Sequence, residues 1–177
     1  MRKMIDDRYI VVSVTHSKPK EKGQKYSFSF KSAGIMNISK KFGEKSIQEY
    51  HKLPEIINYI KETKFDKGKS ELYFYGEAYK YIVKMWLELK PKQVGDDFEI
   101  DWQVVRGHLT GMNGKIRLED HERRTEISLT GTYEATSLPL PAILLDFGLE
   151  IVLQQVAKKI RNYLETGYKK ETASDHW

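Results

Sequence analysis

The chain contains no cysteine among its 177 residues. Disulfide bonds, thiolate catalysis and cysteine-ligated zinc or iron–sulfur clusters are therefore excluded. The phosphate-binding glycine loop, the nucleophile elbow and the HExxH metal motif are also missing from the sequence. The five histidines are scattered without the spacing of metal ligands. We therefore assign no catalytic residue, metal or cofactor, and the sequence favours a binding protein over an enzyme.

Long hydrophobic runs are lacking as well. The longest apolar stretch, residues 138–145, contains two prolines and is too short to span a bilayer. The apolar run at residues 9–12 is far shorter than the hydrophobic region of a secretory signal. We therefore expect a soluble, cytoplasmic protein.

Charge of one sign is only weakly in excess, because 30 Lys and Arg residues face 25 Asp and Glu residues, a net charge of +5. Acidic residues are interleaved with the basic ones, and the lysines of residues 18–25 lie in a turn-like stretch with Pro19 and Gly23. We interpret this charge as a solvated surface. No nucleic-acid partner is expected, while a transient contact with an anionic membrane stays open.

A composition of 40% hydrophobic and 31% charged residues is typical of a globular domain. No linker-like segment divides the chain, so we expect one domain over residues 1–166. Within it, residues 1–25 form an N-terminal extension or an extra strand. The polar residues 167–177 are predicted to be a flexible tail.

Apolar residues alternate at period two in several segments, which is typical of strands with one dry face. They include residues 26–30, 72–89 and 98–104, and further strands are predicted at about 109–118 and 127–133. Pro91 is expected to end the second of these segments, and Gly95 to Asp97 to form a turn. Four consecutive antiparallel strands around Val83, Trp102, Ile116 and Leu129 are therefore predicted.

Helical spacing occurs in two places. Residues 44–60 fit two short helices, with Pro54 in the first turn of the second. A long helix is predicted from just after Pro141 to about Glu165. Apolar residues cover nearly the whole circumference of its first half, so a curved sheet is expected to enclose it.

This order of elements resembles the START-like (SRPBCC) superfamily, which includes polyketide cyclases, coenzyme Q-binding proteins and the birch-pollen-allergen type. The resemblance covers residues 26–165 and is carried by IDWQVVRGHLTGMNGKIRLEDHERRTEISLTGTYEATSLPLPAILL and by KLPEIINYI. The chain departs from the common pattern by lacking an aspartate before Leu53-Pro54 and by its longer N-terminal extension.

The resemblance implies an α+β helix-grip fold, in which a curved antiparallel β-sheet wraps around a long C-terminal α-helix, with two short helices after an early strand. It also implies an internal cavity that receives lipids, sterols, quinones or polyketides. Alternation continued past Val104 places Arg106 and His108 on the apolar face if the strand is regular. Alternatively, Gly107 breaks the strand and both side chains reach water.

On this basis the candidate ligand-binding residues are Tyr81, Met85, Trp102, Val104, Arg106, His108, Met112, Tyr133, Leu144, Phe147 and Ile151. The aromatic members could line a pocket or complete a core. The leading hypothesis is a non-enzymatic carrier or sensor of an apolar small molecule, with the terminal helix and the Pro54 helix at the mouth. One alternative is a cyclase or aromatase in which a cavity side chain polarises a carbonyl. The other is a module that binds a protein or membrane surface through its basic edge.

Overall fold

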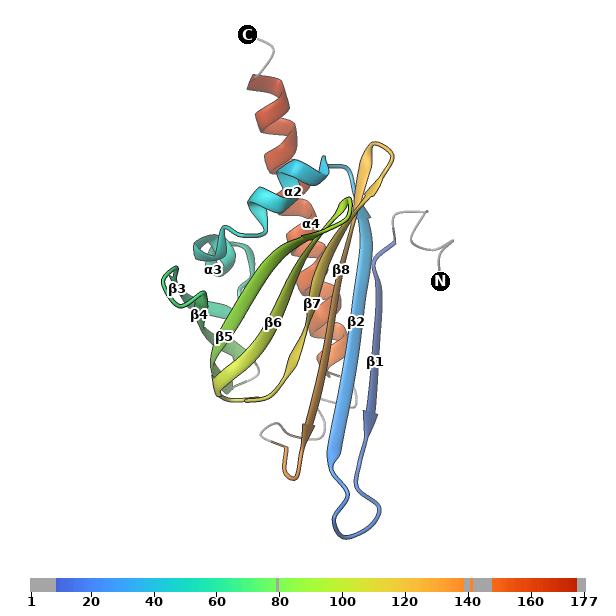
Figure 1. Cartoon of the computed structure of the whole chain (residues 1–177), viewed down its shortest axis with the longest axis vertical. Helices are drawn as coiled ribbons and strands as arrows, with labels where there is room; N and C mark the ends of the chain where they lie inside the picture. Colours follow the sequence, from blue (N-terminus) through green and yellow to red (C-terminus); the bar gives the residue numbers. More distant parts are fainter. Residues whose placement is uncertain (1–8, 79, 139–140, 142–147, 175–177) are drawn as a thin grey trace.

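The computed structural model describes residues 9–78, 80–138, 141 and 148–174. Eight strands form one antiparallel sheet in the order β1-β2-β8-β7-β6-β5-β4-β3 (Figure 1). The strands are β1 Val11–Ser17, β2 Tyr26–Met36, β3 Ile60–Asp66, β4 Glu71–Ala78, β5 Tyr81–Val94, β6 Asp97–Gly107, β7 Asn113–His121 and β8 Arg124–Ala135. The helices are α2 Lys40–Ser46, the 3₁₀ turn η1 Tyr50–Lys52, α3 Leu53–Ile56 and α4 Leu149–Ser174.

The predicted helix-grip architecture is confirmed. The sheet curves, and the long helix α4 crosses its concave face (Figure 1). This helix packs on β1 and β2 and also contacts α2 and α3. The four strands predicted to be antiparallel neighbours are β5 to β8, and they pair consecutively in that order. Strand β1 pairs with β2 in the region where the sequence allowed an extra strand.

Several strand boundaries differ from the sequence prediction. The predicted run 72–89 forms parts of two strands, β4 and β5, and β7 begins at Asn113, because the chain turns between Gly107 and Asn113. Residues 60–66 form the edge strand β3, whereas helical spacing was predicted to run to Ile60. This strand is mostly polar, and Ile60 is its one buried residue. Strand β5 also continues through Pro91. The Leu89 N–H donates to Ser70 O at 2.9 Å, on the side of β5 that faces β4. The Pro91 nitrogen, two residues further along β5, points to the same side. Because β4 pairs with β5 only as far as Glu88, Pro91 removes no ladder hydrogen bond there.

Helix α4 differs from prediction in which of its parts is buried. The first half of the helix was predicted to be enclosed on nearly all sides. In the part that the structure describes this prediction is wrong, because Ile151 is 50% exposed. Leu153, Val156 and Ile160 face β2 and β8 across a small apolar space of about 70 Å³. Against the residues that the structure describes, the helix therefore packs through one side. Within the described residues, no helix is long and apolar enough to cross a membrane.

The C-terminal half of α4 is well anchored, and the helix continues to Ser174 where a flexible tail was predicted from Gly167. Leu164 is 2% exposed and packs with Met36 and Ile38. One turn later, the Tyr168 ring lies 5.2 Å from the Phe42 ring of α2, centroid to centroid. These contacts extend the helix beyond Glu165 despite the polar sequence.

Candidate functional site

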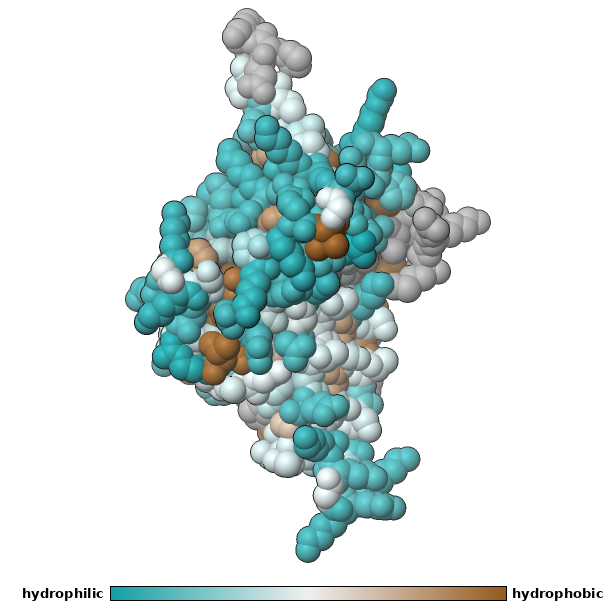
Figure 2. All heavy atoms as spheres, in the orientation of Figure 1, coloured by the Kyte–Doolittle hydropathy of each residue, from teal (hydrophilic) through white to brown (hydrophobic). Residues whose placement is uncertain are grey.

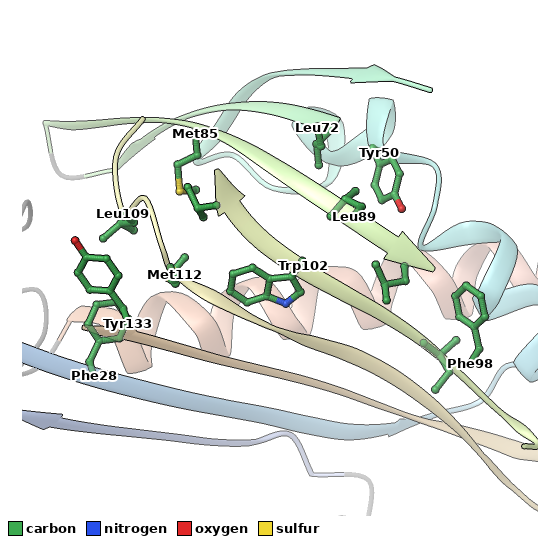
Figure 3. Close-up of a cluster of buried hydrophobic side chains, with 13 residues drawn as sticks. Phe28, Tyr50, Leu72, Met85, Leu89, Phe98, Trp102, Leu109, Met112 and Tyr133 are labelled. Carbon is green, nitrogen blue, oxygen red and sulfur yellow. The ribbon is translucent and has the colours of Figure 1, made fainter. Parts of the chain in front are cut away.

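A cluster of thirteen buried hydrophobic residues fills the concave face of the sheet (Figure 3). Its members come from η1, β2, β4 to β8 and the β6–β7 turn. They are Phe28, Tyr50, Leu72, Met85, Leu89, Phe98, Ile100, Trp102, Val104, Leu109, Met112, Leu118 and Tyr133. We call this set the concave cluster. Its side chains carry no charge, and its side-chain N–H and O–H groups come from one tryptophan and two tyrosines.

Trp102 lies over two glycines in the middle of this face. Four residues on neighbouring strands form one row across the sheet: Trp102 of β6, Gly114 of β7, Gly131 of β8 and Phe30 of β2. A Cβ on Gly114 would lie 2.6 Å from Trp102 Cζ2, and one on Gly131 would lie 3.0 Å from Trp102 Cη2. The two glycines therefore form a floor for the indole, with the Phe30 ring stacked beside it at 6.4 Å between centroids.

The β6–β7 turn brings two more residues into the concave cluster. Gly107, Leu109 and Gly111 all have positive φ, of 89°, 61° and 95°. A leucine rarely adopts this left-handed conformation, which costs free energy unless the surrounding structure imposes it. Here the Leu109 side chain is only 8% exposed, and Met112 N donates to Leu109 O at 2.9 Å. The turn thus inserts Leu109 into the end of the cluster.

A surface hollow of about 490 Å³ adjoins the cluster at this turn. It is lined by Lys84, Trp86, Gly107, His108, Leu109, Thr110, Tyr133 and Ser137. Leu109 and Tyr133 belong to both the hollow and the concave cluster, and they lie next to each other at one end of it (Figure 3). The hollow and the concave cluster are therefore joined through these two residues.

The structure gathers five of the predicted site residues, Met85, Trp102, Val104, Met112 and Tyr133, in the concave cluster. His108 lines the hollow, where its Nδ1 accepts a hydrogen bond from the Lys84 backbone N–H at 3.1 Å.

Four other predicted residues lie away from the cluster or outside the described part of the chain. Tyr81 is 42% exposed at the start of β5, and Ile151 is half exposed on α4. Leu144 and Phe147 fall outside the described residues.

The predicted position of Arg106 on the apolar face is wrong. The register of β5 with β6 shifts, so that Leu87 pairs with Val104 and Trp86 with Arg106. One extra residue in β6 turns Arg106 to the outer face, as expected for a β-bulge. There its side chain is 58% exposed, forms an ion pair with Glu71 at 2.5 Å and lies 4.8 Å from the Trp86 ring centroid.

Charged residues cover the outer face of β5 to β7. The Glu99 carboxylate, only 6% exposed, lies 2.7 Å from Lys115 Nζ, 3.7 Å from Lys92 Nζ and 3.6 Å from Arg117 Nε. The face of the sheet seen in Figure 2 is accordingly mostly hydrophilic, with small hydrophobic patches. No group of three potential metal ligands occurs among the residues that the structure describes. The apolar chemistry of the sheet is thus concentrated on its concave side.

The two tyrosines of the concave cluster are neutral hydrogen-bonding groups. Burial raises the pKa of Tyr50 from 10.0 to about 12. Burial also raises the pKa of Tyr133. Both phenols therefore keep their protons at neutral pH.

The Tyr50 pKa predicts an alkaline loss of stability. The phenol has a pKa of about 12 when folded and 10.0 when unfolded, so the folded state binds more protons between these values. The contribution is complete below about pH 10 and is lost as the pH rises toward 12, a decline of about 2 kcal/mol. Urea unfolding of the parent and of Tyr50→Phe at pH values across this window measures it. An equally steep decline in the variant would contradict this origin.

Sequence reasoning missed the glycine floor and the Leu109 insertion. Gly114 precedes Ile116 and Leu118 in the same alternation, and Gly131 follows Ile127 and Leu129. A glycine at an inward-facing strand position indicates that something packs close to the backbone. That signal identifies both glycines. The left-handed turn around Leu109 has no comparable sequence signal, because a leucine does not favour positive φ.

Comparison with known proteins identifies the fold. No protein-family model matches the sequence, and no curated protein matches it significantly. A STAR-related lipid transfer protein from Xanthomonas axonopodis superposes with a TM-score of 0.68 at 10% identity, covering 84% of this chain and 98% of that one. A START superfamily protein from Mycobacterium smegmatis gives 0.61 at 14% identity, covering 81% and 99%. Ginseng major latex-like protein 151 from Panax ginseng gives 0.58 at 14% identity, covering 77% and 97%. The chain therefore has a START-type fold.

Proposed function

We propose that this START-type chain binds an apolar small molecule, such as a lipid, sterol, quinone or polyketide-like compound, against the concave face of its sheet. The observation that carries the proposal is the concave cluster, which adjoins a surface hollow at Leu109 and Tyr133. The one-sided packing of α4 supports it, since a helix that is not enclosed can shift without unpairing strands. The name of the Xanthomonas neighbour, a lipid transfer protein, agrees with this function by analogy of fold.

The apolar surface is sufficient for useful affinity. Burying one methylene group contributes about 0.8 kcal/mol, so a ten-carbon chain gains about 8 kcal/mol before the cost of ordering is subtracted. A dissociation constant near 1 μM corresponds to about 8 kcal/mol. About one micromolar is therefore the tightest binding that a ten-carbon chain can reach from apolar contact alone, and a larger apolar molecule is needed to offset the cost of ordering.

Titration with the neutral, environment-sensitive dye Nile red tests this function. We expect a saturable rise in fluorescence that an unlabelled fatty acid, sterol or quinone reverses. Val104→Phe should lower dye affinity about tenfold, because Val104 is 1% exposed inside the cluster and a larger side chain takes ligand space. Val94→Phe, on the 43% exposed end of the neighbouring strand, is the matched control and should leave affinity unchanged. Absence of saturable binding in the parent would refute the function.

Arg106→Met separates this function from the cyclase-like alternative. Because Arg106 is on the outer face, we expect unchanged Nile red affinity and a loss of less than about 1 kcal/mol in unfolding free energy, as for an exposed ion pair. Dye titration and urea unfolding measure the two quantities. A tenfold loss of affinity would place the guanidinium at the ligand and revive the alternative.

A further inference from the structure

The indole N–H of Trp102 is a buried donor that finds no acceptor in the described part of the chain. Trp102 is 7% exposed, and its Nε1 has no hydrogen-bond partner among the residues that the structure describes. Buried donors in proteins are nearly always paired, and an unpaired one lowers the stability of the fold. A bound molecule with an acceptor atom would satisfy this donor.

The indole is held where it is by its surroundings. It rests on Gly114 and Gly131 and stacks beside Phe30 with 22° between the ring planes. Figure 3 shows Trp102 at the centre of the concave cluster, with its nitrogen on the side away from Met112. The donor therefore points into hydrophobic surroundings in a fixed orientation, which is the arrangement of a preorganised ligand contact.

We propose that Trp102 Nε1–H donates a hydrogen bond to the bound molecule, and that this molecule is a neutral hydrophobe carrying an acceptor oxygen, such as a ketone or quinone. The inference rests on the proposed binding function and narrows its ligand class. A pure hydrocarbon would leave the donor unpaired, so it should bind less tightly than a ketone of the same size.

The charge of the cluster argues for a neutral acceptor over a carboxylate. The thirteen side chains of the cluster are uncharged, and Arg106, the cation expected beside the ligand from sequence, is on the outer face with Glu71. A carboxylate moved into this cluster would lose its hydration without gaining a cation, which is costly. A carbonyl oxygen needs only a hydrogen-bond donor, and Trp102 supplies one.

Three probes of equal size test the inference. 2-Acetylnaphthalene, 2-isopropylnaphthalene and 2-naphthoate have the same number of non-hydrogen atoms and differ only in the group attached to the ring. We expect the ketone to displace Nile red at about tenfold lower concentration than either the hydrocarbon or the carboxylate. Trp102→Phe should remove the advantage of the ketone over the hydrocarbon, whatever packing it costs both. Tyr73→Phe, at a position that pairs with Trp86 on the outer face and does not line the hollow, should preserve that advantage.

The chemical shift of the Trp102 indole N–H reports the hydrogen bond itself, and a loss of packing alone does not change it in the same way. The chain has three tryptophans, so ¹⁵N labelling gives three indole N–H signals, and Trp102→Phe identifies the relevant one. The ketone should shift this signal downfield, and the isopropyl compound should not.

The possible outcomes separate the inference from the function on which it rests. Three results would overturn the inference and leave apolar binding intact. They are equal binding of ketone and hydrocarbon, tightest binding of the carboxylate, and an indole signal that does not shift when the ketone is added. Failure of Nile red itself to bind would overturn both, whereas saturable Nile red binding that none of the three probes displaces would overturn the inference alone.

Discussion

Gly114→Ala is expected to lower the free energy of unfolding by about 3 kcal/mol. The new Cβ would lie 1.9 Å from Thr130 O and 2.8 Å from Gly131 Cα, both backbone atoms of the neighbouring strand. Relief therefore requires β7 and β8 to separate, and the Trp102 ring must move as well. Urea unfolding monitored by circular dichroism measures the loss.

Gly68→Ala is the matched control for this substitution. Gly68 has an ordinary φ, and a methyl group added to it would have Asp66 Oδ1, the end of a flexible side chain, as its nearest neighbour at 3.3 Å. We expect a change of less than about 1 kcal/mol there. Similar losses in the two variants would mean that strand β7 accommodates a methyl group, and the glycine floor would not be a constraint on the fold.

Leu164→Ala is expected to cost about 3 kcal/mol, because it empties a 2% exposed site between α4 and β2. Ile151→Ala, on the same helix but 50% exposed, should change stability by less than about 0.5 kcal/mol. Thermal and urea unfolding of both variants measure the difference. A larger loss at Ile151 would show that the first half of α4 is the anchored part, contrary to the contacts described above.

The fold was predictable because its main signals are local. Alternation at period two depends on one wet and one dry face, and it identified the strands from β5 to β8. The signal failed at β3, an edge strand whose side chains are mostly polar, so no alternation marks it. It failed again at Pro91, where the missing N–H matters only if a neighbouring strand needs it.

The buried side of α4 was not predictable from its own sequence. An apolar circumference indicates that many side chains could be buried, but the extent of the sheet decides which of them are. The sheet covers one side, which leaves Ile151 half exposed. Conversely, the polar stretch after Gly167 is helical because the Tyr168 ring packs against the Phe42 ring of α2, which lies more than 120 residues earlier in the chain.

The candidate site was predictable only up to the β-bulge. Alternation places Trp102 and Val104 correctly in the concave cluster, and one extra residue in β6 then reverses every later side chain. Arg106 therefore lies on the opposite face from the prediction. Bulges depend on the register of a partner strand, which sequence periodicity does not contain.

Methyl NMR with ¹³C-labelled methionine tests the central proposal most directly. Met85 and Met112 belong to the concave cluster, whereas Met36 lines the separate apolar space under α4. Substitution of each residue by leucine assigns its signal. On titration with 2-isopropylnaphthalene, we expect saturable shifts of the Met85 and Met112 methyl signals and an unchanged Met36 signal. A shift of Met36 alone, or saturation without any change at Met85 and Met112, would contradict ligand binding at the concave cluster.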